Sequence, residues 1–253
     1  MPLLPLKSFV QPDAWSSLRS FTAARIALGR TGAAIPLKEV LALKMAHAHA
    51  RDAVYAELAT VKLSEELSEW QLPVFTLHSQ APNRLQYLQD PGLGRQLDRR
   101  SIPEDIERIN KDGIVIIIAD GLSATAVNTH AVPLLKTLIP ILRQSGKDVS
   151  SILLVQQGRV AISDEIGVLC NAEMSVMLIG ERPGLTAADS MGAYLTYRPC
   201  PGLTDESRNC VSNIHAGGLS YEAAANRISY LVNAACLKQL SGIGLKEEER
   251  LLD

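Results

Sequence analysis

The chain has 253 residues, of which 47% are hydrophobic and 21% charged, and this composition excludes an intrinsically disordered protein. A chain of this length forms one large domain or two small ones, and it buries enough apolar surface to need no disulfide or metal staple. The formal net charge of −2 at pH 7 argues against nucleic acid or an acidic membrane as a partner, because it provides no overall basic field.

Residues 1–100 are expected to form a mainly helical region. Pro36 suits the first turn of a helix, and a mostly apolar face follows at spacings of three and four residues. Its members are Leu41, Met45, Ala48, Asp52 and Tyr55, and the face ends near Leu58. An Asp-Pro-Gly turn at residues 90–92 then precedes a change of pattern. We therefore expect a second, α/β domain over residues 101–253.

Four segments of that second domain have the β-branched or apolar character of buried strands. They are residues 114–119, 151–155, 174–179 and 193–197. Helices are expected between them, from an N-cap at Ser123 to Gln144 and over residues 164–169, and a long helix follows an N-cap at Ser220. Alternating strands and helices predict an α/β fold with a mostly parallel, Rossmann-like sheet and flanking helices.

Ligands of such sheets bind at the carboxyl ends of the strands. Here those ends are residues 120–121 (Asp-Gly), 158–160 (Gly-Arg-Val) and 180–182 (Gly-Glu-Arg). A glycine beside a charged residue suits a backbone that approaches a ligand closely, although ordinary turn chemistry accounts for these glycines equally well.

Several common catalytic patterns are absent or incomplete. No glycine-rich loop for a dinucleotide or a triphosphate occurs in the sequence. Ser123 follows a predicted strand, as the serine of a hydrolase does, but the last glycine of the G-x-S-x-G motif is missing and an N-cap explains this serine. His47 and His49 point in different directions on a helix, so they cannot hold a metal together.

Acidic residues near the strand ends offer a further candidate site. Asp120, Asp164, Glu165 and Glu181 could surround a divalent cation, since hard cations prefer oxygen ligands. Their spacing does not specify such a site, and capping or loop hydrogen bonds are the alternative role.

A polar segment at residues 209–218, NCVSNIHAGG, is expected to be a loop before the last helix. It offers backbone donors, a thiol and an amide to a large polar ligand. Its pattern Asn213-x-His215-x-x-Gly218 is similar to the loop whose histidine ligates cobalt in base-off cobalamin domains, but the orienting aspartate is absent. A hydrogen-bonded loop histidine is therefore the preferred interpretation of His215.

Five segments in a fixed order resemble one protein family, the small (light) subunit of ethanolamine ammonia-lyase. The resemblance extends from about Ser20 to Gly244. It is carried by residues 22–32 (TAARIALGRTG), 118–123 (IADGLS), 158–160 (GRV), 180–184 (GERPG) and 210–215 (CVSNIH).

The resemblance implies a subunit of an enzyme that uses adenosylcobalamin to convert ethanolamine into acetaldehyde and ammonia by a radical mechanism. In that family the large subunit is a TIM barrel with the substrate site, and the cofactor lies between barrel and small subunit. This chain is then expected to contact the cofactor and to supply no catalytic residue of its own. A stand-alone hydrolase and an assembly scaffold without cofactor contact are the alternatives.

Carried over by motif, the family's cofactor contacts fall on Val160, Glu181 and Cys210. Arg159, Ser212 and Asn213 flank these three residues in the sequence. The family binds its cofactor base-on, which agrees with a His215 that does not ligate cobalt.

The cytoplasm is the expected location. The longest purely apolar run, residues 114–119, is far shorter than the roughly 20 residues of a membrane-spanning helix. The start, MPLLPLK, lacks the basic region of a signal peptide, and the four cysteines show no close pairing that would indicate disulfides. Family members in microcompartments have a longer N-terminal extension, so encapsulation remains the alternative location.

Overall fold

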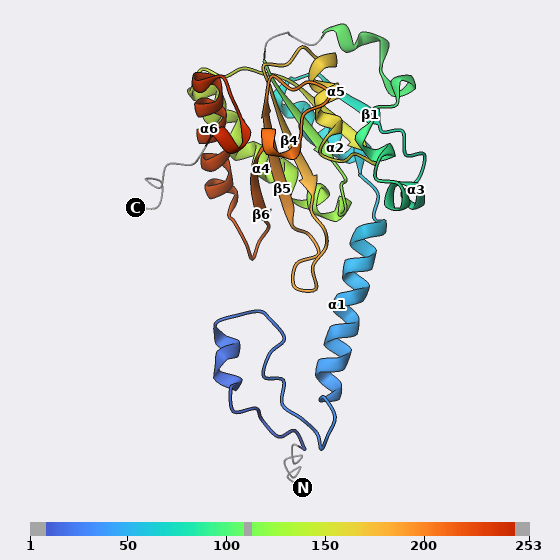
Figure 1. Ribbon diagram of the computed structural model, residues 1–253, viewed down its shortest axis with the longest axis vertical. Coiled ribbons are helices and arrows are strands. Elements are labelled where there is room, and N and C mark those ends of the chain that lie inside the picture. Colours follow the sequence, from blue (N-terminus) through green and yellow to red (C-terminus); the bar gives the residue numbers. More distant parts are fainter. Residues whose placement is uncertain (1–8, 109–112, 246–253) are drawn as a thin grey trace.

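A six-stranded sheet with helices on both faces forms the centre of the protein (Figure 1). The computed structural model describes residues 9–108 and 113–245. Strands β1, β3, β2 and β4 run parallel to one another, whereas β5 is antiparallel to both β4 and β6. In sheet order the strands are β1 (Val74–His78), β3 (Val149–Gln156), β2 (Ile114–Ala119), β4 (Met174–Gly180), β5 (Met191–Tyr197) and β6 (Asn209–Ile214). The predicted α/β class and Rossmann-like parallel part are confirmed.

Six α-helices accompany the sheet in the described part of the chain. They are α1 (Leu37–Tyr55), α2 (Thr60–Leu67), α3 (Arg84–Gln89), α4 (Ala124–Gln144), α5 (Ile162–Leu169) and α6 (Tyr221–Lys238). Short 3-10 helices lie at Ser16–Ser20, Ser68–Trp70, Leu93–Arg95, Arg99–Ser101, Glu104–Arg108, Asp205–Ser207 and Gly242–Gly244.

Most predicted elements are confirmed, and two strands were missed. β2 has the predicted bounds, and Ser123 and Ser220 cap α4 and α6 by accepting a hydrogen bond from the amide three residues later. The prediction of a loop over residues 209–218 was wrong for its first half, which forms β6. β1 lies in the region expected to be mainly helical. The division of the chain at residue 100 stays a prediction.

Two apolar layers cover the sheet, one on each face. Ile116 and Ile118 of β2 pack with α4 and α6, whereas Ile117 and Ala119 belong to the layer under α5. The central strand is buried on both faces because parallel crossovers place helices on each side. This explains why its sequence is uniformly apolar rather than alternating.

A buried ion pair ties α5 to the segment before β6. The Arg208 guanidinium donates to both Asp164 carboxylate oxygens, at 2.6 and 2.7 Å. Both side chains are almost completely buried, and Arg208 also donates to the Thr196 hydroxyl at 3.2 Å. The pair therefore couples the helix on one face to the antiparallel end of the sheet.

Residues 9–55 project from the rest of the protein and are here named the N-terminal arm. In Figure 1, α1 runs away from the sheet, and the chain before it folds back beside the helix. The predicted apolar face of α1 is present but exposed: Leu41, Met45 and Tyr55 are each more than half exposed, and Ala53 is the one buried residue of the helix. The helical periodicity predicted here is confirmed, but among the described residues this apolar face stays largely exposed.

Candidate functional site

A pocket of about 320 Å³ lies where β2 and β4 end, at the carboxyl edge of the parallel strands. Side chains and backbone from five separate segments line it. They are Tyr87, Gly121, Leu122, Arg159, Val160, Ile179, Gly180, Glu181, Arg182 and Tyr194. The pocket therefore combines two arginines and a carboxylate with apolar and aromatic surface.

Asp120 holds the turn that carries Val160 into the pocket. Its two carboxylate oxygens accept hydrogen bonds from the amides of Gln157 (2.9 Å) and Gly158 (3.1 Å). Gln157 has a positive φ of 56°, so this turn departs from ordinary extended backbone. Burial raises the pKa of Asp120 to about 6, while these two amides and Arg84 oppose the increase. The carboxylate thus fixes the position of residues 157–160.

Tyr87 supports the same turn. The guanidinium groups of Arg84 and Arg159 both lie over its ring, with their central carbons 4.6 and 4.5 Å from the ring centre. Its hydroxyl donates to the Gly158 carbonyl at 3.2 Å, and burial raises the pKa of this phenol to about 12. Arg159 in turn donates to the Tyr87 carbonyl at 3.0 Å. Cation–π contacts and hydrogen bonds therefore immobilise Arg159 at the pocket wall.

Two glycines form the floor of the pocket because their backbones touch. Gly121 has a φ of 54°, and a Cβ there would lie 2.3 Å from the Gly180 carbonyl oxygen. A Cβ on Gly180 would lie 2.0 Å from the Ser123 carbonyl oxygen. Close backbone approach, rather than turn chemistry alone, requires glycine at both strand ends.

Glu181 follows β4 directly and points toward β5 and β6. Its Oε2 accepts hydrogen bonds from the Ser190 hydroxyl and, at 3.3 Å, from the Asn213 amide. The Glu181 side chain packs against Gly192 of β5. A Cβ on Gly192 would lie 3.0 Å from Glu181 Oε1, so a larger residue there would crowd the carboxylate. Within the described residues both of these bonds end on Oε2, so Oε1 is available to a ligand.

Cys210 lies beside the pocket rather than in its wall. It pairs with Tyr194 across the antiparallel strands β5 and β6, so the two side chains lie on the same face of the sheet. Burial raises the pKa of the Cys210 thiol, so the thiol stays protonated at neutral pH and is not a thiolate nucleophile. Tyr194 is thus the link between Cys210 and the pocket.

The structure brings Val160 and Glu181 into one pocket and places Cys210 next to it. Arg159 also lines the pocket, and Asn213 contacts Glu181 through its amide. The sequence did not indicate Tyr87 or Tyr194. The pairing of Tyr194 with Cys210 was the one signal that could have pointed to Tyr194. That pairing depends on β6, a strand that was not predicted.

The other candidate residues do not form sites. Among the described residues no three His, Cys, Asp or Glu side chains gather as a metal centre would require. Asp164 is paired with Arg208, and Glu165 accepts a hydrogen bond from the Leu97 amide at 3.3 Å. His47 and His49 are exposed on α1. The alternative of a cation site at these acidic residues therefore has no support among the described residues.

Ser123 and His215 are both occupied by local hydrogen bonds. Ser123 is fully buried and donates to the Ala188 carbonyl at 2.8 Å, besides capping α4. His215 Nδ1 accepts from the Gly217 amide at 3.2 Å, and Nε2 donates to Asn213 Oδ1 at 3.0 Å. Neither a free nucleophile nor a free imidazole nitrogen results.

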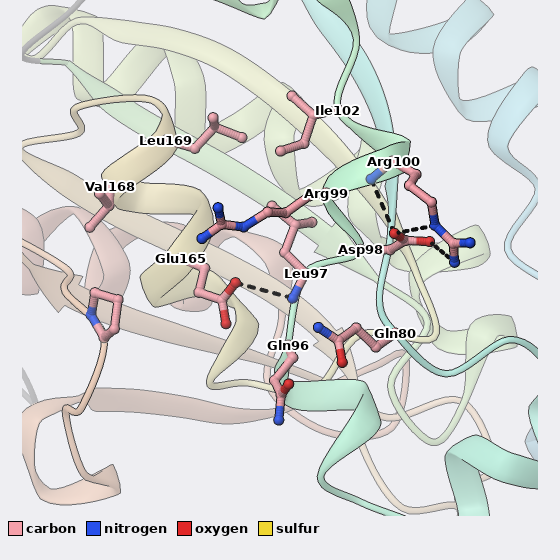
Figure 2. Close-up of a pocket in the computed structure, with 11 residues that line it drawn as sticks. Gln80, Gln96, Leu97, Asp98, Arg99, Arg100, Ile102, Glu165, Val168 and Leu169 are labelled. Atoms are coloured by element: carbon pink, nitrogen blue, oxygen red, sulfur yellow. Dashed lines mark hydrogen bonds and ion pairs between the residues drawn. The ribbon is translucent and has the colours of Figure 1, made fainter.

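A larger cavity of about 960 Å³ lies between residues 96–102 and the end of α5 (Figure 2). Figure 2 shows Asp98 held by Arg100 and Glu165 directed at the Leu97 amide, so hydrogen bonds within the protein already engage both of these carboxylates. None of the predicted site residues Val160, Glu181 and Cys210 lines this cavity. The smaller pocket at the strand ends is therefore the candidate site.

Comparison with known proteins identifies the family. A model of the ethanolamine ammonia-lyase light chain matches residues 12–246. The chain is 48% identical over 238 residues to the ethanolamine ammonia-lyase small subunit of Pseudomonas putida (strain W619), covering 92% of this chain and 88% of the relative. It is 46% identical over 251 residues to the small subunit of Pseudomonas fluorescens (strain SBW25), covering 98% and 91%.

A third relative is the ethanolamine ammonia-lyase small subunit of Pseudomonas aeruginosa (strain LESB58), 48% identical over 246 residues that cover 94% of this chain and 90% of the relative. In the described part of the chain, no helix is both long and apolar enough to cross a membrane. With the matches extending over nearly its whole length, the chain belongs to the ethanolamine ammonia-lyase light chain family.

Proposed function

We propose that this chain is the small subunit of an adenosylcobalamin-dependent ethanolamine ammonia-lyase and binds the cofactor together with a large, TIM-barrel subunit. The enzyme converts ethanolamine into acetaldehyde and ammonia, and the large subunit supplies the substrate site. The observation that carries the proposal is the convergence of Val160 and Glu181 on one pocket at the strand ends. This chain contributes binding and orientation and has no catalytic residue.

The pocket fits one part of such a cofactor. Its volume of about 320 Å³ is too small for a whole cobalamin, which is consistent with a cofactor shared between two subunits. Cobalamin carries many amide side chains, a phosphate and a ribose, and the pocket offers arginines and a carboxylate to such groups. Arg159 Nε is buried without a hydrogen-bond partner among the described residues, as a donor reserved for a ligand would be.

Each proposed contact has a physical role. Val160 offers apolar surface from a turn that Asp120 and Tyr87 hold rigidly. Glu181 accepts hydrogen bonds from amide or hydroxyl groups of the cofactor through Oε1. Cys210 gives a small, polarisable contact beside Tyr194. When bound, the cofactor supplies the radical chemistry, and the protein supplies position and exclusion of water.

The cytoplasm is the proposed location. All four cysteines of the chain are free thiols, as is usual in a reducing compartment. Cys200 is exposed and yet unpaired.

Replacing Glu181 by alanine is expected to weaken cofactor binding by roughly 10- to 150-fold, because a buried hydrogen bond that involves a charged group contributes about 1.5–3 kcal/mol. The measurement is a spectroscopic titration of the assembled two-subunit enzyme with adenosylcobalamin. Glu181→Gln keeps the shape of the side chain and separates the loss of charge from the loss of packing.

Glu57→Ala is the matched control, since it removes an exposed carboxylate that lies outside the pocket. It is expected to leave the affinity unchanged. Unchanged affinity in Glu181→Ala as well, in a complex that still assembles, would mean that the chain is a scaffold without cofactor contact at this residue.

A further inference from the structure

The N-terminal arm, residues 9–55, concentrates the exposed apolar surface of this chain. Of the 19 large hydrophobic side chains that are exposed in the described residues, 12 belong to the arm. They include Trp15 and Phe21, which are 68% and 85% exposed, and the α1 residues Leu41 and Met45. A monomeric protein rarely exposes so much contiguous apolar surface, and such surface marks a site of interaction with another protein.

The described residues of this chain do not bury the apolar surface of the arm. α1 is 19 residues long, and Ala53, near its end, is its one buried residue. Most helical stability in proteins comes from the packing of an apolar face, so a helix that stands alone needs a partner surface. The seven exposed hydrophobics outside the arm are spread over several separate elements. Outside the arm, the described residues of a second copy therefore offer less exposed apolar surface than the arm itself presents.

The arm contacts the body at two points, each next to a segment that carries pocket residues. At its base, the Val54 carbonyl accepts a hydrogen bond from Arg84 Nε at 2.6 Å, and Arg84 Nη1 lies 3.7 Å from Asp120 Oδ2. Nearer its start, Arg25 donates to the Leu185 carbonyl at 3.0 Å, in the loop between β4 and β5 that begins with Glu181. Figure 1 shows the arm extending from the end of the sheet at which this loop lies.

From this placement we propose that the N-terminal arm is a clasp by which this chain holds the large subunit, on the same side of the protein as the cofactor pocket. The inference rests on the proposed function, because it takes the partner that covers the pocket to be the large subunit. A partner seated over the strand ends lies directly against α1, so one surface continues from the pocket to the arm.

The charge of the arm indicates which kind of surface on the large subunit would bind it. The arm carries six Lys or Arg residues against three Asp or Glu, although the whole chain has a net charge of −2. The complementary surface is therefore an apolar groove with an acidic rim. Arg30 and Lys44 are exposed members of this basic set and would meet that rim.

The test compares two double variants in the full-length chain. Leu41→Ser with Met45→Ser changes two exposed side chains of the arm, and Val61→Ser with Leu237→Ser changes two that are 73% and 84% exposed elsewhere. Binding of each purified chain to the large subunit is titrated by biolayer interferometry. Because burial of each Leu or Met side chain contributes about 1.5–3 kcal/mol, the arm variant is expected to bind at least about 100-fold more weakly, and the control like the wild type.

The outcomes separate this inference from the proposed function. If the wild-type chain forms a complex with the large subunit but the arm variant binds equally well, the clasp is wrong and the proposed function stands. If the wild-type chain binds no large subunit, both fail. A third outcome is that the wild-type chain self-associates, and that Leu41→Ser with Met45→Ser abolishes self-association but leaves binding to the large subunit unchanged. This outcome would assign the arm to a second copy and overturn the inference.

Discussion

Replacing Arg208 by leucine is expected to lower the free energy of unfolding by about 3–5 kcal/mol, because the substitution leaves a buried carboxylate without its counter-ion. Asp164 is 3% exposed and accepts two hydrogen bonds from Arg208. Urea denaturation of the wild type and the variant at neutral pH measures the loss. A variant as stable as the wild type would show that Asp164 finds another partner or is reached by water.

The double variant Asp164→Leu with Arg208→Leu provides the internal control. Replacing a buried ion pair by two apolar residues of similar size often leaves the free energy of unfolding unchanged. The double variant is therefore expected to recover most of the stability that Arg208→Leu loses. The exposed pair between Arg100 and Asp98 is the surface comparison, and Arg100→Leu is expected to leave the unfolding curve unchanged.

The stability of the wild type relative to an Asp120→Asn variant is expected to fall by about 2.5 kcal/mol between pH 4 and pH 7. The full effect is about 3 kcal/mol, at about 1.4 kcal/mol for each unit of pKa shift. Burial raises the pKa of Asp120 from 3.8 to about 6 in the folded protein. Between these values the unfolded chain has lost its proton while the folded protein keeps it. This contribution is therefore complete below pH 3.8 and is lost as the pH rises through about 6.

Urea denaturation of both proteins across this pH range checks the prediction, because the other titrating groups are common to the two and cancel in the difference. A difference that does not vary with pH would mean that Asp120 titrates at its ordinary value. An NMR titration of the Asp120 carboxyl carbon tests the same point directly.

The central part of the fold was predictable because its residues follow simple rules. The run Ile114–Ala119 is apolar on both faces, which only a doubly covered strand permits. β6 was missed because it lies at the edge of the sheet, and only Val211 and Ile214 are buried in it. These are three residues apart, since the pairing with β5 shifts register and Asn213 has a φ of 64°. No alternation of polar and apolar residues could reveal such a strand.

The candidate site was predictable where it depends on strand ends and not where it depends on tertiary contacts. Glu181 follows a recognisable strand, so its position at the carboxyl edge followed from the topology. Tyr87 comes from a segment with no such signal, and only the fold places it against Gly158 and Arg159. Likewise, the periodicity of α1 predicted an apolar face but carried no information on what that face contacts.

The order of the strands also sets the order in which a growing chain can assemble its sheet. β1 leaves the ribosome before β2, yet it pairs with β3. The strand that follows β1 in the sequence is therefore not the strand beside it in the sheet. Phe75 and Leu77 must therefore wait, unpaired, until Leu153 and Val155 have been synthesised. In the finished sheet, β1 lies on one side of the β3–β2 pair and β4, β5 and β6 lie on the other. During synthesis, β1 is therefore a strand without its pairing partner for as long as it takes to make the residues up to β3.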